Sequence, residues 1–240
     1  MSIAFFDVDG TLLPHPSLER RLFWNLFRRG KIPAASCLRW VTQSVRLGPW
    51  KFKAMAQSNK TYLRGVPVSA LEDFTSLLPE FFPAAIQRIW WHALRGDTIV
   101  LVTGTLAAIA DTVKLALERE LRWRGVEANL NVIATQLEVK NARCTGNLRG
   151  VPMLGEQKAS ALTEFAAALD VALIDCFAYG DHHADRSMLA AAGKPFAVNP
   201  TPALRSLARH HRWRILNWTR CPSRTLFARN AFKWKGEAAR

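Results

Sequence analysis

Two aspartates near the start of the sequence occupy positions where aspartate is uncommon, at the end of a predicted strand. Asp7 and Asp9 end the apolar run at residues 3–8, which has the length of a buried strand. Aspartate is disfavoured inside strands, and side chains two residues apart point to the same side, so both carboxylates can face one site. Gly10 and Thr11 then supply a flexible turn and a hydroxyl. The pattern indicates a site built on two carboxylates, with a simple turn or capping pair as the alternative.

Three further groups of polar residues follow predicted strands or begin a predicted helix. Thr103 and Gly104 come after the apolar run at residues 98–103, where a hydroxyl and backbone N–H groups suit an anion. Lys158 lies at the start of a helical pattern, and Asp181 and Asp185 follow a third strand. The carboxyl ends of parallel strands form the crevice where open α/β sheets bind ligands. All the candidate metal ligands offer oxygen, which suits magnesium better than zinc.

The elements that position these residues alternate between strands and helices. That alternation predicts an α/β fold, a doubly wound parallel sheet covered by helices on both faces. We expect strands at residues 3–8, 98–103, 174–179, 196–198 and 214–216, helices at 104–117, 157–169 and 187–192, and an extended segment at 131–148 with a hairpin turn at Lys140-Asn141.

The long segment between the first two strands differs from the rest. It is rich in Trp, Leu, Phe and Arg at helical spacing and is interrupted by prolines, which predicts several short helices. We therefore divide the chain into a core at residues 1–15 and 95–220, a helical cap at residues 16–94 and a basic tail at residues 221–240.

In their order and spacing, the four motifs resemble the haloacid dehalogenase superfamily, in the phosphoserine phosphatase-like branch (subfamily IB) that carries a helical cap after the first motif. The segment FFDVDGTLL from Phe5 is the most specific of them. The resemblance covers about residues 1–218 and is strongest outside the cap. It implies a Rossmann-like core and a magnesium-dependent phosphomonoesterase.

The resemblance also implies a role for each motif residue. Asp7 would be the nucleophile that forms an aspartyl phosphate, and Asp9 would protonate the leaving oxygen and later activate water. Thr103, Gly104 and Lys158 would hold the phosphoryl group. Asp185 would orient Lys158 or a metal-bound water, and Mg²⁺ would be bound by Asp7, Asp181 and the backbone carbonyl of Asp9.

Elementary electrostatics supports this assignment. An anionic nucleophile and a phosphoryl group repel each other, so the site must bring positive charge, here a divalent cation and Lys158. The same residues would serve a phosphotransferase. A dehalogenase is disfavoured, because it needs no acid two residues after the nucleophile. A non-catalytic module that binds an anion or lipid is the alternative from another class, although such a scaffold need not keep four polar motifs together.

Departures from the phosphoserine phosphatase pattern bear on the substrate. Those enzymes have a glutamate about nine residues beyond the nucleophile that grips the substrate ammonium, and Pro16 stands there in this sequence. Glu19 is a poor substitute. The second motif of that family reads Ser-Gly-Gly where this sequence has Thr103-Gly104-Thr105, and its last motif has Asn-Asp where this sequence has Ala184-Asp185. Phosphoserine is therefore doubtful, and we expect a small phosphorylated metabolite or a lipid phosphate.

The charge of the chain is unevenly distributed. The net charge is +14, of which residues 20–71 carry +11 and residues 205–240 carry +9, leaving −6 for the remainder. Basic segments that contain Trp, Phe and Leu suit contact with an anionic membrane surface, while the alternatives are a solvated surface and apolar residues that pack the cap's own core. We do not expect specific nucleic-acid binding.

Cysteine usage and hydropathy point to a cytoplasmic protein, with the inner face of the membrane as a peripheral site. The four cysteines lack CxxC spacing, so neither a disulfide framework nor a zinc site is expected. We find no apolar run long enough to cross a bilayer and no secretory signal pattern at the start of the sequence.

Overall fold

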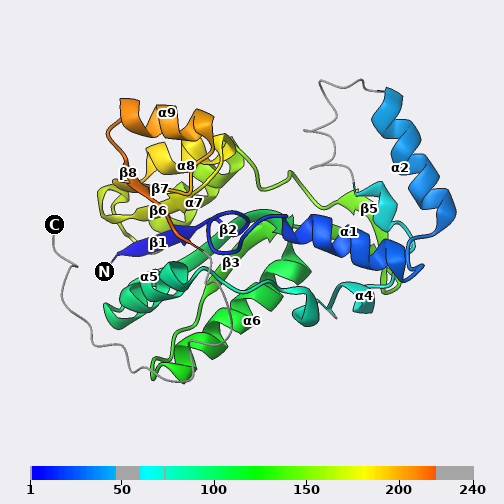
Figure 1. Ribbon diagram of the computed structural model, residues 1–240, viewed down its shortest axis with the longest axis horizontal. Helices are drawn as coiled ribbons and strands as arrows, with labels where there is room; N and C mark the ends of the chain where they lie inside the picture. Colours follow the sequence, from blue (N-terminus) through cyan, green and yellow to red (C-terminus); the bar gives the residue numbers. More distant parts are fainter. Residues whose placement is uncertain (1, 47–59, 73, 220–240) are drawn as a thin grey trace.

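A parallel six-stranded sheet forms the centre of the molecule. The computed structural model describes residues 2–46, 60–72 and 74–219. The strand order is β3-β2-β1-β6-β7-β8, and each neighbouring pair is parallel (Figure 1). The strands are β1 (Ile3–Phe6), β2 (Thr98–Leu106), β3 (Asn131–Thr135), β6 (Phe177–Gly180), β7 (Lys194–Val198) and β8 (Arg214–Leu216). The predicted doubly wound sheet is confirmed.

Strand β1 shows why both faces of the sheet are covered. Its four residues are all fully buried, and because side chains alternate along a strand, Ile3 and Phe5 face one layer while Ala4 and Phe6 face the other. The first layer contains α7 (Glu156–Ala168), α8 (Arg186–Ala191) and α9 (Pro202–His210). The second contains α5 (Pro83–Leu94) and α6 (Ala107–Trp123).

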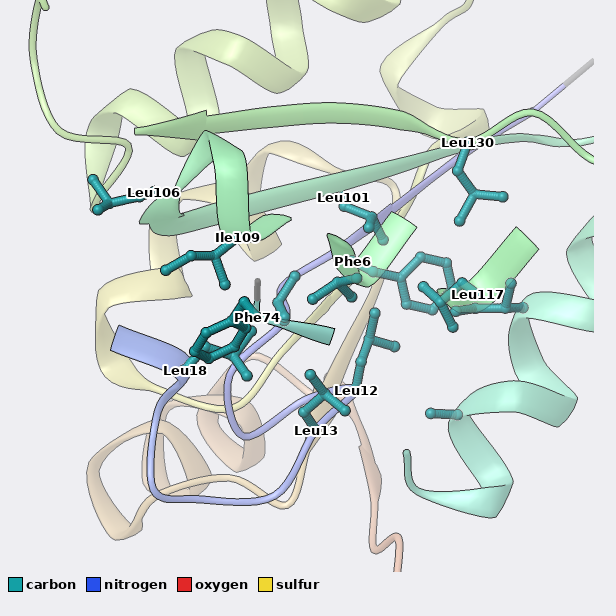
Figure 2. Packing of buried hydrophobic residues seen from close by; sticks show 14 of the residues in the cluster. Phe6, Leu12, Leu13, Leu18, Phe74, Leu101, Leu106, Ile109, Leu117 and Leu130 are labelled. Carbon is teal, nitrogen blue, oxygen red and sulfur yellow. The ribbon is translucent and has the colours of Figure 1, made fainter. Parts of the chain in front are cut away.

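The second layer continues without a break into the segment inserted after β1. Leu12, Leu13 and Leu18 pack in one cluster with Phe6 and with residues of β2 and α6 (Figure 2). Helix α1 (Leu18–Arg28) buries Leu18, Leu22 and Leu26, which lie four residues apart on one face of the helix. This shared core fixes the start of α1 beside the carboxyl ends of the strands.

The described residues in the rest of the inserted segment include several short helices, as its prolines predict. These are α2 (Ala34–Arg46), η1 (Thr61–Leu63), α4 (Ser69–Glu72) and η2 (Thr75–Leu77). Helix α5 falls inside the range expected for the cap, yet it packs on β2 and α6 of the core. The contacts of α5 therefore favour a boundary between cap and core that lies before this helix.

A hairpin that leaves the core holds the inserted segment in place. Strands β4 (Leu137–Lys140) and β5 (Arg143–Leu148) are antiparallel, and the turn between them lies next to the predicted Lys140-Asn141 position. The backbone N–H of Cys144 donates to the carbonyl of Val66, and the N–H of Gly65 donates to the carbonyl of Cys144. These bonds extend the hairpin with backbone from the cap segment.

Several element boundaries differ from those expected. Strand β2 continues to Leu106, so helix α6 begins later than the pattern indicated. Strand β3 pairs with β2 in the main sheet rather than joining the hairpin. A turn of 3₁₀ helix, Leu173–Asp175, occupies the beginning of the strand expected at residues 174–179. No helix within the described residues is long and apolar enough to cross a membrane. The basic tail lies outside the described residues.

Candidate active site

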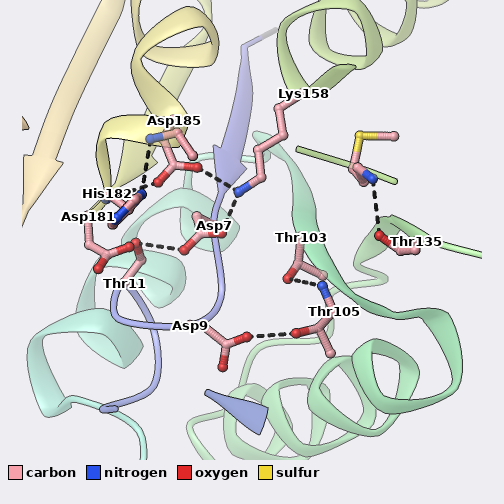
Figure 3. Close-up of polar contacts among 12 residues, drawn as sticks. Asp7, Asp9, Thr11, Thr103, Thr105, Thr135, Lys158, Asp181, His182 and Asp185 are labelled. Carbon is pink, nitrogen blue, oxygen red and sulfur yellow. Dashed lines mark hydrogen bonds and ion pairs between the residues drawn. The ribbon is translucent and has the colours of Figure 1, made fainter. Parts of the chain in front are cut away.

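A cavity of about 660 Å³ opens at the carboxyl ends of β1, β2 and β6. It brings together the predicted site residues, which come from four separate parts of the chain (Figure 3). The predicted residues that line it are Asp7, Asp9, Thr103, Gly104, Lys158, Asp181 and Asp185. Their convergence agrees with the rule that parallel sheets bind ligands at this edge.

Lys158 joins two of the aspartates in the floor of the cavity. Its Nζ donates to Oδ1 of Asp7 at 2.5 Å and to Oδ1 of Asp185 at 2.7 Å, and all three side chains are buried. Burial alone would lower the pKa of Lys158, but the charges of Asp185 and Asp7 outweigh it and raise that pKa above its ordinary value. Lys158 is therefore a fixed positive charge beside Asp7.

Asp185 is held from a second side as well. Its Oδ2 accepts a hydrogen bond from the backbone N–H of His182 at 3.1 Å, within the short helical turn His183–Asp185. The ring of His182 accepts from the N–H of Ala184. Asp185 thus points at Lys158 from a rigid turn, an arrangement that suits the predicted role of orienting the lysine.

Three carboxylates converge at one point of the cavity. Oxygens of Asp7, Asp181 and Asp185 lie within 4.8 Å of one another, and all three residues are buried. Burial raises the pKa of Asp7 well above its ordinary value; Lys158 opposes that rise, while Asp185 and Asp181 add to it. The pKa of Asp181 is raised, chiefly by burial. One lysine cannot balance three carboxylates, so the oxygen donors present fit a divalent cation such as Mg²⁺.

Asp9 points to a different part of the cavity from Asp7. Its Oδ2 accepts from the hydroxyl of Thr105 at 2.6 Å, and its Oδ1 accepts from the backbone N–H of Leu18 at 2.8 Å. The carboxyl group is therefore oriented by β2 and by the first residue of α1. Its side chain lies apart from the three converging carboxylates (Figure 3), in a position suited to a group that exchanges a proton with the substrate.

The segment after β1 approaches Asp181 so closely that a side chain does not fit. Gly10 has φ +91°, and a Cβ atom placed on it would collide with the carboxylate of Asp181. Thr11, the next residue, donates from its hydroxyl to Oδ2 of Asp7 at 3.2 Å. The glycine and threonine of this motif thus allow the close approach and orient the first aspartate.

Thr103 and Gly104 line the same cavity on the adjacent strand. The hydroxyl of Thr103 accepts from the backbone N–H of Thr105 at 3.1 Å. Gly104 packs so closely on Leu154 that a Cβ would clash with the leucine side chain. The hydroxyl and the exposed backbone remain the groups that this strand can offer to a phosphoryl group.

Sequence reasoning missed several residues of the cavity. His15 lies with Nε2 3.3 Å from Oδ2 of Asp181, and this hydrogen bond raises the pKa of the histidine. Arg20 lines the mouth, and the Thr105 hydroxyl bonds Asp9. The TGT pattern was a signal for Thr105. Nothing in the spacing indicated His15 or Arg20, because they reach the cavity only through the turn into α1.

Comparisons with known proteins agree with this arrangement. A family model described as haloacid dehalogenase-like hydrolase matches residues 4–190. The sequence is 30% identical over 206 residues to phosphoserine phosphatase SerB2 of Mycobacterium tuberculosis, covering 86% of this chain and 46% of that protein. The chain therefore spans about half the length of that relative.

Solved structures share the fold. A protein of unknown function from Bordetella pertussis Tohama I has a TM-score of 0.68 and 27% identity, covering 90% of this chain and 97% of its own. A phospho-aspartyl intermediate analogue of phosphoserine phosphatase has a TM-score of 0.61 and 20% identity, with 91% and 93% covered. At that lower identity the likeness is one of fold.

Proposed function

Because the chain belongs to the haloacid dehalogenase-like hydrolase family, we propose that it is a magnesium-dependent phosphomonoesterase that works through an aspartyl phosphate on Asp7. The observation that carries the proposal is the buried chain of contacts from Asp7 through Lys158 to Asp185, set beside Asp181 in one cavity. An anionic nucleophile can approach a phosphoryl group only where positive charge is fixed, and Lys158 supplies part of it.

Mg²⁺ would supply the rest. The residues that would hold it are Asp7, Asp181 and the backbone carbonyl of Asp9, with Asp185 bonded to Lys158 beside them. Bound there, the cation would stabilise the negative charge that develops on the transferring phosphoryl group.

In the first half of the reaction, a carboxylate oxygen of Asp7 bonds to phosphorus while the ester oxygen leaves. Asp9 gives that oxygen a proton, since its carboxyl group is fixed by Thr105 and by the N–H of Leu18 rather than by the lysine. Lys158 and the Thr103 hydroxyl hold the oxygens of the phosphoryl group as it transfers.

In the second half, water attacks phosphorus and Asp9 takes up its proton. The bond between Asp7 and phosphorus breaks, so inorganic phosphate leaves and Asp7 is again a carboxylate. Asp7, which forms the bond to phosphorus, is oriented by Lys158 and Thr11, whereas Asp9, which moves the proton, is oriented by Thr105 and Leu18.

For the substrate we propose a small phosphorylated metabolite or a lipid phosphate other than phosphoserine. Pro16 stands where phosphoserine phosphatases are expected to have the glutamate that grips the ammonium. Glu19 lines the cavity, but its Oε2 accepts from Lys60 at 2.6 Å, so an internal cation already occupies that oxygen.

The test is a phosphate-release screen with magnesium over amino-acid, sugar, nucleotide and lipid phosphates. Asp7→Asn serves as the inactive control, and added acceptor alcohols separate hydrolysis from phosphoryl transfer. Rapid acid quenching with labelled substrate should trap phosphate on the wild-type chain. A folded protein that releases phosphate from no ester in the screen would overturn the proposal.

A further inference from the structure

A second cavity opens beside the active site, on the outer face of helix α1. Its volume is about 400 Å³, and it is lined by Pro16, Arg20, Arg21, Trp24, Asn25, Arg28 and Leu77. Pro16 and Arg20 also line the active-site cavity. The two cavities are therefore neighbours, and Pro16 and Arg20 lie between them.

Four residues that line the second cavity form one face of α1. Arg21, Trp24, Asn25 and Arg28 follow the spacing i, i+3, i+4 and i+7, which places them side by side along the helix. A different face of the helix carries the leucines that pack against the core. The same amphipathic pattern that anchors α1 thus presents three arginines and an indole to the second cavity.

These three arginines are not neutralised by the described part of the chain. None of the ion pairs among the described residues includes Arg20, Arg21 or Arg28. Arg21 instead donates from Nε to the carbonyl of Pro16 at 3.0 Å, which fixes the rim between the two cavities. No acidic residue lines the second cavity.

The two cavities differ in the charges of the residues that line them. The active-site cavity is lined by four aspartates and Glu19, so it needs added cations before it can hold an anion. The second cavity holds only positive charge, and guanidinium groups bind phosphate and carboxylate through paired N–H donors. Trp24, which is 46% exposed, offers an apolar surface for the part of a ligand between two anionic groups.

Resting on the proposed phosphatase activity, we infer that the second cavity binds a second phosphate of the substrate, so that the preferred substrates carry two phosphates. The phosphoryl group to be removed lies over Asp7, and the other lies along α1 among Arg20, Arg21 and Arg28. Arg20 and Arg28 are two turns apart, which gives about 12 Å over which the distal phosphate can be placed.

A solvated basic face is the competing explanation. Such a face maintains solubility wherever it lies, and it requires neither a hollow nor continuity with the active site. Elsewhere in the described chain, arginines beside acids form pairs, as Arg95 does with Asp97 at 3.0 Å. Arginines that line a hollow without acids beside a phosphoryl-transfer site suit a ligand better.

The experiment compares alkanediol bisphosphates with alkanol monophosphates of the same chain length, using the full chain with magnesium. We expect kcat/KM for the bisphosphate to exceed that for the matched monophosphate by at least about tenfold at an optimal spacer length. In Arg20→Ala/Arg28→Ala the ratio should fall to near one, mainly through KM. The ratio cancels any general loss of activity in the variant.

Controls separate charge from folding. Arg119→Ala removes an exposed arginine from α6 and should keep the wild-type ratio. Arg28→Lys should keep part of the preference for the bisphosphate that the double alanine variant loses, because lysine retains the charge but lacks the paired donors. Circular dichroism on each variant checks that the fold is intact.

Each outcome addresses one proposal. If neither ester is hydrolysed, the proposed phosphatase function fails. If both are hydrolysed with a ratio near one at every spacer length, the second-phosphate site is wrong while the phosphatase function stands. Phosphatidic acid vesicles form a separate arm: if the arginines matter only there, the face contacts a membrane and the inference is overturned.

Discussion

Asp7 and Lys158 form the contact on which the proposed chemistry depends. The ammonium of Lys158 is buried between two carboxylates, so its charge is held in place rather than screened by water. Asp7 is oriented by the lysine on one oxygen and by the Thr11 hydroxyl on the other. Small changes at these positions should alter rate much more than fold.

Replacing Asp7 by Asn tests the nucleophile. The amide keeps the shape of the side chain but cannot attack phosphorus, so kcat should fall at least about a thousandfold. Thermal stability should change little, because Asn removes one of three crowded carboxylates and retains the volume. Steady-state kinetics and a melting curve measure both effects. Activity near that of the wild type would place the nucleophile elsewhere.

Replacing Asp9 by Asn tests the proton donor. The amide oxygen can still accept from Leu18 N–H, so the geometry of the loop should persist. Esters with poor leaving groups need a proton and should lose far more activity than p-nitrophenyl phosphate, whose leaving group needs little help. Comparing kcat/KM for an alkyl phosphate with that for p-nitrophenyl phosphate measures the difference. Equal losses on both esters would assign Asp9 a structural or metal-binding role.

His92 introduces a pH dependence into folding, away from the cavity. Its Nδ1 lies 2.8 Å from Asp97 Oδ2 and its Nε2 2.9 Å from the Tyr179 hydroxyl. Because Asp97 accepts as a carboxylate, Nδ1 carries the proton and Nε2 accepts from Tyr179. Burial lowers the pKa of His92 from 6.5 to about 4, outweighing the hydrogen bond to Asp97.

The sign of the effect follows from the two pKa values. An unfolded chain takes up a proton on His92 near pH 6.5, whereas the folded chain does so only near pH 4. The stabilisation is therefore fully present above about pH 6.5 and is lost as pH falls toward 4, a change of about 3 kcal/mol.

His92→Gln should remove this dependence. The variant should be less stable than the wild type at neutral pH, and the gap between the two should narrow toward pH 4. Urea unfolding at a series of pH values measures the difference in free energy of unfolding. His210→Gln, at an exposed position on α9, is the matched control and should leave the profile unchanged. A constant gap across the series would contradict the prediction.

At the scale of elements, the turn between β1 and α1 decides how the site is assembled. It begins with Gly10 against Asp181, passes His15 at the cavity and ends where Leu18 donates to Asp9. The hairpin β4–β5 fixes the far side by bonding the backbone at residues 65–66. The inserted segment is thus bonded to the core at its start and to the hairpin near its middle.

Gly10→Ala tests this turn. Alanine adds strain at positive φ, and its Cβ would displace the carboxylate of Asp181, so we expect at least about a tenfold loss of kcat/KM and weaker activation by magnesium. Gly30→Ala is a matched control, because Gly30 also has positive φ (+62°) but has open space around it. Gly30→Ala should lose about 1 kcal/mol of stability from its positive φ alone, and Gly10→Ala should lose more because of the added clash. Equal activity in the two variants would show that the close approach to Asp181 is unimportant.

At the scale of the whole molecule, the basic tail should be separable from catalysis. Every residue of the candidate active site lies within residues 7–185. Deletion of residues 222–240 removes five basic residues and one acid, which lowers the net charge from +14 to +10. Activity on p-nitrophenyl phosphate should be unchanged.

The same deletion tests the membrane hypothesis. The full chain should co-sediment with anionic vesicles and not with neutral ones, and the shortened chain should bind less, since each basic residue near such a surface contributes about 1 kcal/mol. Absence of the full chain from the anionic pellet at low salt would refute membrane contact.

The sequence by itself determined the sheet and the residues at its edge. Apolar runs such as residues 3–8 predict buried strands, and the polar residues at the ends of parallel strands meet at one edge of the sheet, so Asp7, Thr103 and Asp181 could be predicted together. A local sequence pattern is enough to predict these features, because strands and helices alternate regularly in this kind of fold.

Only the tertiary structure decided which groups touch. The separation of Asp9 from the other carboxylates depends on Thr105 and on the start of α1, which are 96 and 9 residues away along the chain. The placement of His15 and the hollow beside α1 likewise arise from how the inserted segment packs against the core. Such contacts result from the three-dimensional packing of segments that are distant in the sequence, so the spacing of residues along the chain does not predict them.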